Sequence, residues 1–186
     1  MIIQQLNNEL FYIEHLTPTE DLSNFRCLKA YGLENYLKNY AVGDENVGAA
    51  RTYLIKSCDT KEIVAYFTLR CGLITVSRGF WKGFDASTGI ELANFATNDS
   101  YREGYDQIPK LGSYVFLNFI LPLAREIRKY VGAEFLYIYS LPEHKLMEHY
   151  STMGFNRADI RMERFVYRHV KPYYDKHCIF MFQKLD

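Results

Sequence analysis

The stretch QIPKLGSYVF, residues 107–116, begins as a short polar loop and continues into a segment with helical spacing. Apolar side chains recur along it at intervals of three and four: Phe116, Ile120, Leu123, Ile127 and Val131. This periodicity predicts a helix over residues 112–131, kinked at Pro122 and ended by a left-handed Gly132. A helix N-terminus carries unpaired N–H groups and partial positive charge, so the stretch is suited to binding a phosphate group.

The rest of the chain alternates between strand and helix signals. Strands are expected over residues 10–16, 51–57, 62–73, 89–97, 134–140 and 178–185. Further helices are expected over residues 17–28, 33–40 and, after a capping box at Ser140 and Glu143, up to Gly154. Residues 76–89 contain several glycines and predict a loop. This order predicts an α/β (α+β) chain with a mixed sheet and helices on both of its faces.

Length and charge limit the possible classes of protein. The chain has 186 residues, which predicts one domain over residues 1–186, and 22 basic and 22 acidic residues, which give zero net charge. A nucleic-acid or lipid partner would therefore need a local basic patch. The sequence shows neither a secretory signal nor an apolar run of about 20 residues, so we expect a cytoplasmic protein without a membrane partner. The cysteine and histidine spacings do not indicate a metal site.

Three motifs and the order of elements resemble the GNAT superfamily of acyl-CoA-dependent N-acyltransferases, over roughly residues 50–186. They are Phe95-Ala96-Thr97 at the end of a strand, the loop from Gln107 to Gly112 before a helix, and Tyr150 shortly before Gly154-Phe155. The resemblance implies a mostly antiparallel central sheet of six to seven strands. It also implies transfer of an acetyl group from acetyl-CoA to a primary amine of a small molecule or protein, by direct attack in a ternary complex and without a metal.

The resemblance also implies where acetyl-CoA binds. Its pyrophosphate is expected at Gln107 and at the residues that open the helix, which are Lys110, Leu111, Gly112 and Ser113. Its pantetheine arm is expected beside Phe95, Ala96 and Thr97. The loop departs from the family pattern, because Pro109 removes one N–H donor and Lys110 replaces the first glycine, although its ammonium group can bind phosphate as a point charge. The connection is about five residues longer than in the family, so Arg102 competes with Gln107 for the same motif position.

Two residues are candidates for the chemistry of acetyl transfer. Tyr150 matches the family tyrosine that protonates the departing thiolate, because a phenol with a pKa of about 10 stays protonated at neutral pH. Glu91 lies five residues before Ala96, the position of the catalytic glutamate in histone-type members, and other members use an ordered water instead. Tyr150 also fits a role in core packing, and Glu91 fits a solvent-facing or lysine-paired strand residue. The alternative function is a GNAT-fold module that binds CoA or a macromolecule without turnover.

An arginine stripe provides a second hypothesis about partners. Arg157, Arg161, Arg164 and Arg168 recur at helical spacing, and a helix there would present them on one face, where they could bind RNA or an acidic partner. A solvated helix face explains the same pattern. A homodimer formed through an unpaired edge strand is also consistent with this class of fold.

Overall fold

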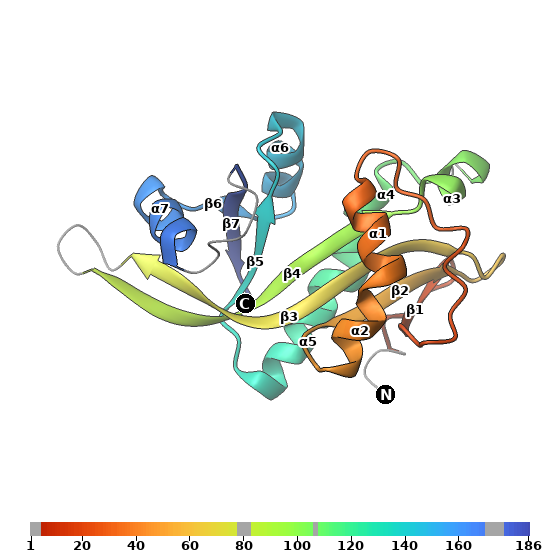
Figure 1. The fold of residues 1–186 in the computed structure, drawn as a ribbon, viewed down its shortest axis with the longest axis horizontal. Coiled ribbons are helices and arrows are strands. Elements are labelled where there is room, and N and C mark those ends of the chain that lie inside the picture. The colour runs from red at the N-terminus through yellow and green to blue at the C-terminus, as the bar shows by residue number, and fades with distance from the viewer. Residues whose placement is uncertain (1–4, 78–82, 106–107, 170–176) are drawn as a thin grey trace. The chain divides into compact units, whose positions relative to one another are not determined.

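The computed structural model describes residues 5–77, 83–105, 108–169 and 177–186. Its strands are β1 (Phe11–His15), β2 (Arg51–Ser57), β3 (Ile63–Ser77), β4 (Phe84–Thr97), β5 (Phe135–Ser140), β6 (Asn156–Arg157) and β7 (Ile179–Lys184). They form a seven-stranded sheet in the order β1-β2-β3-β4-β5-β7-β6 (Figure 1). The pair β4–β5 is parallel, whereas β1–β2, β2–β3, β5–β7 and β6–β7 are antiparallel. The predicted mixed, mostly antiparallel sheet is confirmed.

The helices are α1 (Tyr31–Asn39), α2 (Ala41–Asn46), α3 (Asp99–Gly104), α4 (Leu111–Val115), α5 (Leu121–Val131), α6 (His144–Thr152) and α7 (Ile160–His169). A π-helical segment, Phe116–Ile120, joins α4 to α5. The helical run therefore starts at Leu111 and ends at Val131, close to the predicted bounds. In the described part of the chain, no helix has the length and apolar character needed to cross a bilayer.

The π-helical segment lies immediately before Pro122. Leu121 N–H donates to the carbonyl of Phe116, five residues earlier, which widens this turn. A proline cannot donate to the carbonyl four residues before it, so its place in the helix is accommodated by this irregular turn. Gly132 ends the run with a φ of 53°, the left-handed conformation that the sequence predicted.

The predicted helix over residues 17–28 is wrong. This segment forms separate turns, in which Glu20 N–H donates to Thr17 O and Phe25 N–H donates to Leu22 O, both at 3.2 Å. Side chains outside the segment accept hydrogen bonds from its last N–H groups: Asn98 from Arg26, Glu34 from Cys27 and Asp99 from Leu28. These hydrogen bonds to side chains replace the backbone hydrogen bonds of the predicted helix.

Two further local predictions are corrected. The capping box at Ser140 and Glu143 is wrong, because α6 begins only at His144 and the Ser140 hydroxyl donates to Leu141 O at 3.0 Å. The predicted loop over residues 76–89 is largely strand, since β3 extends to Ser77 and β4 starts at Phe84. Residues 78–82 lie outside the described chain. Gly154 does follow α6 in the left-handed conformation, with a φ of 94°.

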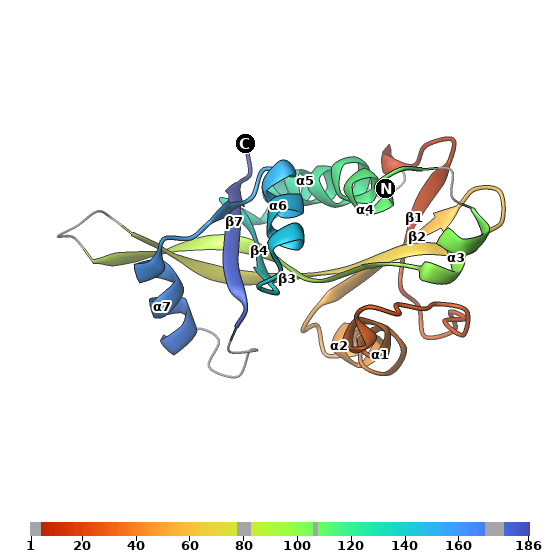
Figure 2. The same ribbon diagram turned by 90° about the horizontal axis from the view of Figure 1, so that it is seen from above.

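Contacts divide the chain into two compact units. The first comprises Met1–Arg70 and Leu92–Leu123, and the second comprises Cys71–Glu91 and Ala124–Asp186. In the first unit, α1 and α2 pack over Leu54 and Tyr66. Tyr114 of α4 contacts Phe11 with ring centroids 5.8 Å apart, on the opposite face of the β1–β2 pair. Helices therefore cover both faces there, as predicted (Figure 2).

The second unit has its own apolar core under α7. Its buried members are Ile74, Tyr137, Ala158, Met162, Val166 and Phe180. Aromatic residues on β5 and β7 supply the sheet side of this core. That residues 1–186 form one domain stays a prediction.

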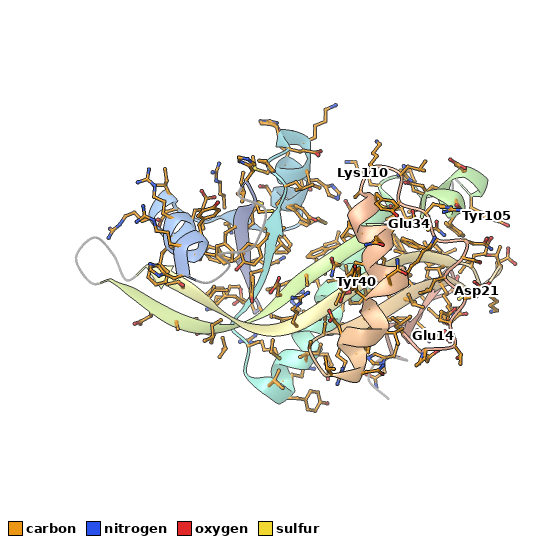
Figure 3. All side chains as sticks on the ribbon, viewed as in Figure 1. Glu14, Asp21, Glu34, Tyr40, Tyr105 and Lys110 are labelled. Atoms are coloured by element: carbon orange, nitrogen blue, oxygen red, sulfur yellow. The ribbon has the colours of Figure 1, made fainter. Side chains whose placement is uncertain are left out.

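Glu34 on α1 binds the irregular segment that precedes the helix (Figure 3). We predict that these contacts make the free energy of unfolding decrease at acid pH. Its carboxylate accepts from Lys38 Nζ at 2.9 Å, Cys27 N–H at 2.9 Å and Arg26 Nη1 at 3.2 Å. The hydrogen bond from Lys38, followed by that from Cys27, lowers the pKa of Glu34 from 4.5 to about 2. A lowered folded-state pKa stabilises the protein above the unfolded value, and this stability is lost as the pH falls through the folded value.

Denaturant unfolding of the wild-type protein and Glu34→Gln should reveal this dependence. Near neutral pH the variant should be less stable by about 1–3 kcal/mol, the usual value of hydrogen bonds to a buried charge. The difference should shrink between about pH 5 and pH 2, because the wild-type carboxylate is then protonated. Parallel curves of unfolding free energy against pH would contradict this role for Glu34.

Candidate functional site

The start of α4 keeps a glycine-like turn without a glycine. Lys110 is the residue before the helix (Figure 3). Its φ of 59° and ψ of 47° lie in the left-handed region. A residue with a side chain occupies this region at a cost of about 1–2 kcal/mol, so glycine is its usual occupant. The lysine therefore adopts the backbone conformation expected of the glycine that it replaces.

The residues after Lys110 present the N-terminus of the helical run. The first helical hydrogen bond runs from Tyr114 N–H to Lys110 O at 3.1 Å, so the N–H groups of Leu111 and Gly112 precede it. Leu111 is buried, Gly112 and Ser113 are half-buried, and the lysine side chain is exposed. Backbone donors, partial positive charge and an ammonium group thus meet at one place that can bind a phosphate.

The two residues that compete for the first loop position differ in their surroundings. Arg102 lies in α3 and is exposed, with Nη1 at 3.7 Å from Asp99 Oδ1. It is therefore part of a helix that the sequence reading did not predict, and not of the loop that opens α4. Gln107 lies outside the described residues.

A cavity of about 370 Å³ lies beside this helix N-terminus in the first unit. Its walls are Glu9, Leu10, Phe11, Ser57, Asp59, Thr60, Tyr101, Arg102, Tyr105, Ile108 and Leu111. The rings of Tyr101 and Tyr105 stack with centroids 5.0 Å apart. The walls carry charges of both signs, because Glu9 and Asp59 are acidic and Arg102 is basic.

The end of β4 contains the three residues of the strand motif. Ala96 is buried in the core of the first unit, and Phe95 and Thr97 are half-buried. The parallel ladder with β5 pairs Gly89, Ile90 and Glu91 with Phe135, Leu136 and Tyr137. Both strands continue beyond that ladder, β4 to Thr97 and β5 to Ser140.

Glu91 is buried next to a tyrosine that the sequence reading did not single out. Only 4% of Glu91 is exposed, so it does not face solvent at a strand edge. The hydroxyl of Tyr137 donates to Glu91 Oε2 at 3.4 Å. Two glycines within strands, Gly72 and Gly89, are a sequence feature that points to such a contact. Glycine in a strand often marks a close approach by another group.

Tyr150 lies in the last turn of α6 and is half-buried. Its ring meets that of Phe155 edge-on, with centroids 5.7 Å apart. Burial raises the pKa of Tyr150 from 10.0 to about 12. The phenol is therefore a proton donor throughout the neutral range, and its ring also has the packing role that the sequence allowed.

The candidate residues are distributed over both units. Lys110 to Ser113 and Phe95 to Thr97 belong to the first unit, whereas Glu91 and Tyr150 belong to the second. Among the described residues, no group of three His, Cys, Asp or Glu side chains could hold a metal ion.

The arginine stripe is shorter than predicted. Residues 160–169 do form a helix, α7, and Arg161, Arg164 and Arg168 are exposed on it. Arg157 lies instead in β6, and its guanidinium makes two hydrogen bonds to Glu163, at 2.7 and 3.0 Å. Its charge is thus compensated by Glu163. Arg161, Arg164 and Arg168 form the exposed basic surface of α7.

The strand order, the parallel β4–β5 pair and the helix that follows β4 define the fold of the GNAT superfamily. The chain is similar to a Tyr→Phe mutant of the toxin AtaT bound to acetyl-CoA and to the C-terminus of the antitoxin AtaR, with TM-score 0.67, 16% identity and coverage of 94% of this chain and 93% of that chain. It is similar to a Tyr→Phe mutant of KacT, with TM-score 0.68, 16% identity and 95% coverage of each chain. A third similar structure is AtaT complexed with acetyl-methionyl-tRNAfMet, with TM-score 0.66, 15% identity and coverage of 91% and 93%. The chain matches no protein-family model and no curated protein sequence.

Proposed function

We propose that the chain is an acetyl-CoA-dependent N-acetyltransferase that acetylates a primary amine by direct attack. The observation that carries this proposal is the helix N-terminus at Leu111 to Ser113, opened by a left-handed Lys110, in a chain with the GNAT fold. The structure of AtaT with acetyl-CoA supports the same choice of co-substrate. The pyrophosphate is assigned to Lys110 to Ser113, where backbone donors and positive charge favour it.

Each remaining candidate has one task in the proposed reaction. Glu91 accepts a proton from the amine, directly or through a water, so that the nitrogen can attack the thioester carbonyl. Backbone N–H groups near Phe95 to Thr97 stabilise the oxyanion that forms. When the carbon–sulfur bond breaks, Tyr150 gives its proton to the thiolate.

Aminoacyl-tRNA is the acceptor class that we propose to test first. AtaT has been solved with acetyl-methionyl-tRNAfMet, in which the acetylated group is an amino acid carried by RNA. Arg161, Arg164 and Arg168 on α7 offer this chain a local basic surface, which a partner with a phosphate backbone requires because the net charge is zero. Free amines and protein amines remain the alternative acceptors. A homodimer formed through an edge strand stays a prediction.

Calorimetric titration with acetyl-CoA, and separately with CoA lacking the 3′-phosphate, tests the binding part of the proposal. We expect a Kd on the order of 1–100 μM for acetyl-CoA, the range typical of enzyme substrates. Transfer is then measured as thiol release with total aminoacyl-tRNA and with a set of free primary amines. Binding without any transfer would favour the alternative module without turnover. No binding at all would reject the enzyme and a CoA-binding module, and would leave only a module that binds a macromolecule.

Lys110→Gly separates the two contributions of this residue. The left-handed turn suits glycine, so thermal stability should stay the same or rise, by at most about 1 kcal/mol. Affinity for acetyl-CoA should fall several-fold and lose part of its salt dependence, because the ammonium group is removed while the turn is kept. Unchanged affinity and unchanged salt dependence would show that the lysine side chain does not contact the phosphates.

A further inference from the structure

We propose that Tyr137 is a positioning residue for Glu91, and that Gly72 and Gly89 are glycines because they leave room for it. This inference rests on the proposed acetyl transfer and assigns a support to its proton acceptor. All four residues belong to the second unit, so the argument uses contacts within that unit alone.

Register places the two polar side chains next to each other. Glu91 of β4 and Tyr137 of β5 are direct partners in the parallel ladder, and neighbours across a ladder point to the same face of a sheet. The Tyr137 hydroxyl donates to Glu91 Oε2 at 3.4 Å, and only 3% of Tyr137 and 4% of Glu91 are exposed. A buried carboxylate needs such donors, because a buried charge without partners is strongly unfavourable.

Two glycines form the space that the tyrosine fills. A Cβ at Gly72 of β3 would lie 1.9 Å from the Tyr137 hydroxyl oxygen, and a Cβ at Gly89 of β4 would lie 3.0 Å from two of its ring carbons. Neither glycine has a positive φ, so backbone conformation does not explain them. The absence of a side chain at both positions allows the hydroxyl to reach Glu91.

Aromatic neighbours hold the ring from its other sides. Phe180 of β7 lies 5.7 Å from it between centroids, and Tyr139 meets it edge-on at 6.0 Å. Since the ring has one place to occupy, its hydroxyl is a fixed donor and orients the carboxylate before any substrate binds. A proton acceptor held in this way avoids the loss of rate that follows from a loosely placed group.

Four single variants, one of them a control, and one double variant test the proposal by steady-state thiol release from acetyl-CoA, with aminoacyl-tRNA and free primary amines as acceptors. Tyr137→Phe removes the hydroxyl and keeps the ring. We expect kcat to fall about 10- to 100-fold, the effect of losing one hydrogen bond to a charged group, while KM for acetyl-CoA changes little and thermal stability falls because the buried carboxylate loses a donor. Gly72→Ala should give the same kinetic change, because it displaces the hydroxyl without removing an ionisable group.

The double variant Glu91→Gln/Tyr137→Phe should be no slower than Glu91→Gln alone, because two residues that act as one unit are not additive. Tyr130→Phe, at an exposed tyrosine of α5 in the same unit, is the control and should retain the wild-type kcat. If Gly72→Ala fails to fold, the kcat of Tyr137→Phe tests the positioning role.

The outcomes distinguish this inference from the proposed function. A wild-type protein without acetyl-CoA binding or turnover rejects the proposed function and this inference with it. An active wild-type protein with an unchanged Tyr137→Phe variant, or with one altered only in stability, rejects the positioning role alone. A Tyr137→Phe effect that persists in full in the Glu91→Gln background would also reject it, since the tyrosine would then act through another group.

Discussion

Tyr150→Phe is expected to lower the rate of acetyl transfer by about 100- to 10,000-fold, the range that general acid catalysis contributes. The substitution removes one hydroxyl and leaves the ring packed against Phe155, so the fold should be kept. The affinity for acetyl-CoA should change by no more than a few-fold. The burial that raises the pKa of Tyr150 to about 12 keeps the wild-type phenol protonated up to strongly alkaline pH. Its loss should therefore lower the rate throughout the neutral range and not only on one side of a pH optimum.

The measurement is kcat for thiol release, accompanied by calorimetric titration of the same preparation with acetyl-CoA. Tyr130→Phe is the matched control, because Tyr130 is an exposed tyrosine on α5 whose hydroxyl donates only to Glu126 among the described contacts. A wild-type rate in Tyr150→Phe would remove this residue from the mechanism. A large loss of acetyl-CoA affinity would instead assign it to binding.

Gly112→Asp is expected to weaken acetyl-CoA binding by about 10- to 100-fold, with opposite effects on stability and on affinity. A carboxylate in the first turn of a helix interacts favourably with the positive end of the helix, so thermal stability should be kept or slightly raised. The same carboxylate repels a pyrophosphate and competes with it for the N–H groups before Tyr114. A fall in affinity without a fall in stability would place the phosphates at this helix terminus.

The control for Gly112→Asp is Gly32→Asp, which introduces the same carboxylate near the start of α1. No heavy atom lies within 4 Å of a Cβ built at Gly32, so the aspartate has room there. Affinity for acetyl-CoA should remain at the wild-type value in this variant. If Gly112→Asp binds acetyl-CoA as tightly as wild type does, the co-substrate binds elsewhere.

Local patterns were sufficient to predict most of the fold. The strands and the long helix that ends at Gly132 were read from periodicity, because their buried faces impose a regular spacing of apolar residues. The predictions of a helix over residues 17–28 and of a cap at Ser140 were wrong for a different reason. Their start signals are polar side chains, and such side chains serve turns as readily as helices when distant groups bind the backbone.

The candidate site was predictable only as far as its motifs extend. Tyr150 and Glu91 could be singled out because they lie at fixed distances from other recognisable residues. The glycines within strands indicate that some group approaches closely, but they do not identify Tyr137, since its contact with Glu91 crosses 46 positions of the chain and depends on strand pairing. The conformation of Lys110 was equally hidden, because lysine seldom adopts a left-handed backbone.

The turn at Lys110 implies a particular route of divergence for chains of this fold. Glycine, asparagine and, here, lysine can adopt the same pair of backbone angles at different costs, so the turn can be kept while the residue changes. A lineage can then lose the glycine of the loop while it conserves the direction of every N–H group behind it. In such a lineage, the sequence of the loop changes while the backbone N–H groups at the start of the helix keep their directions.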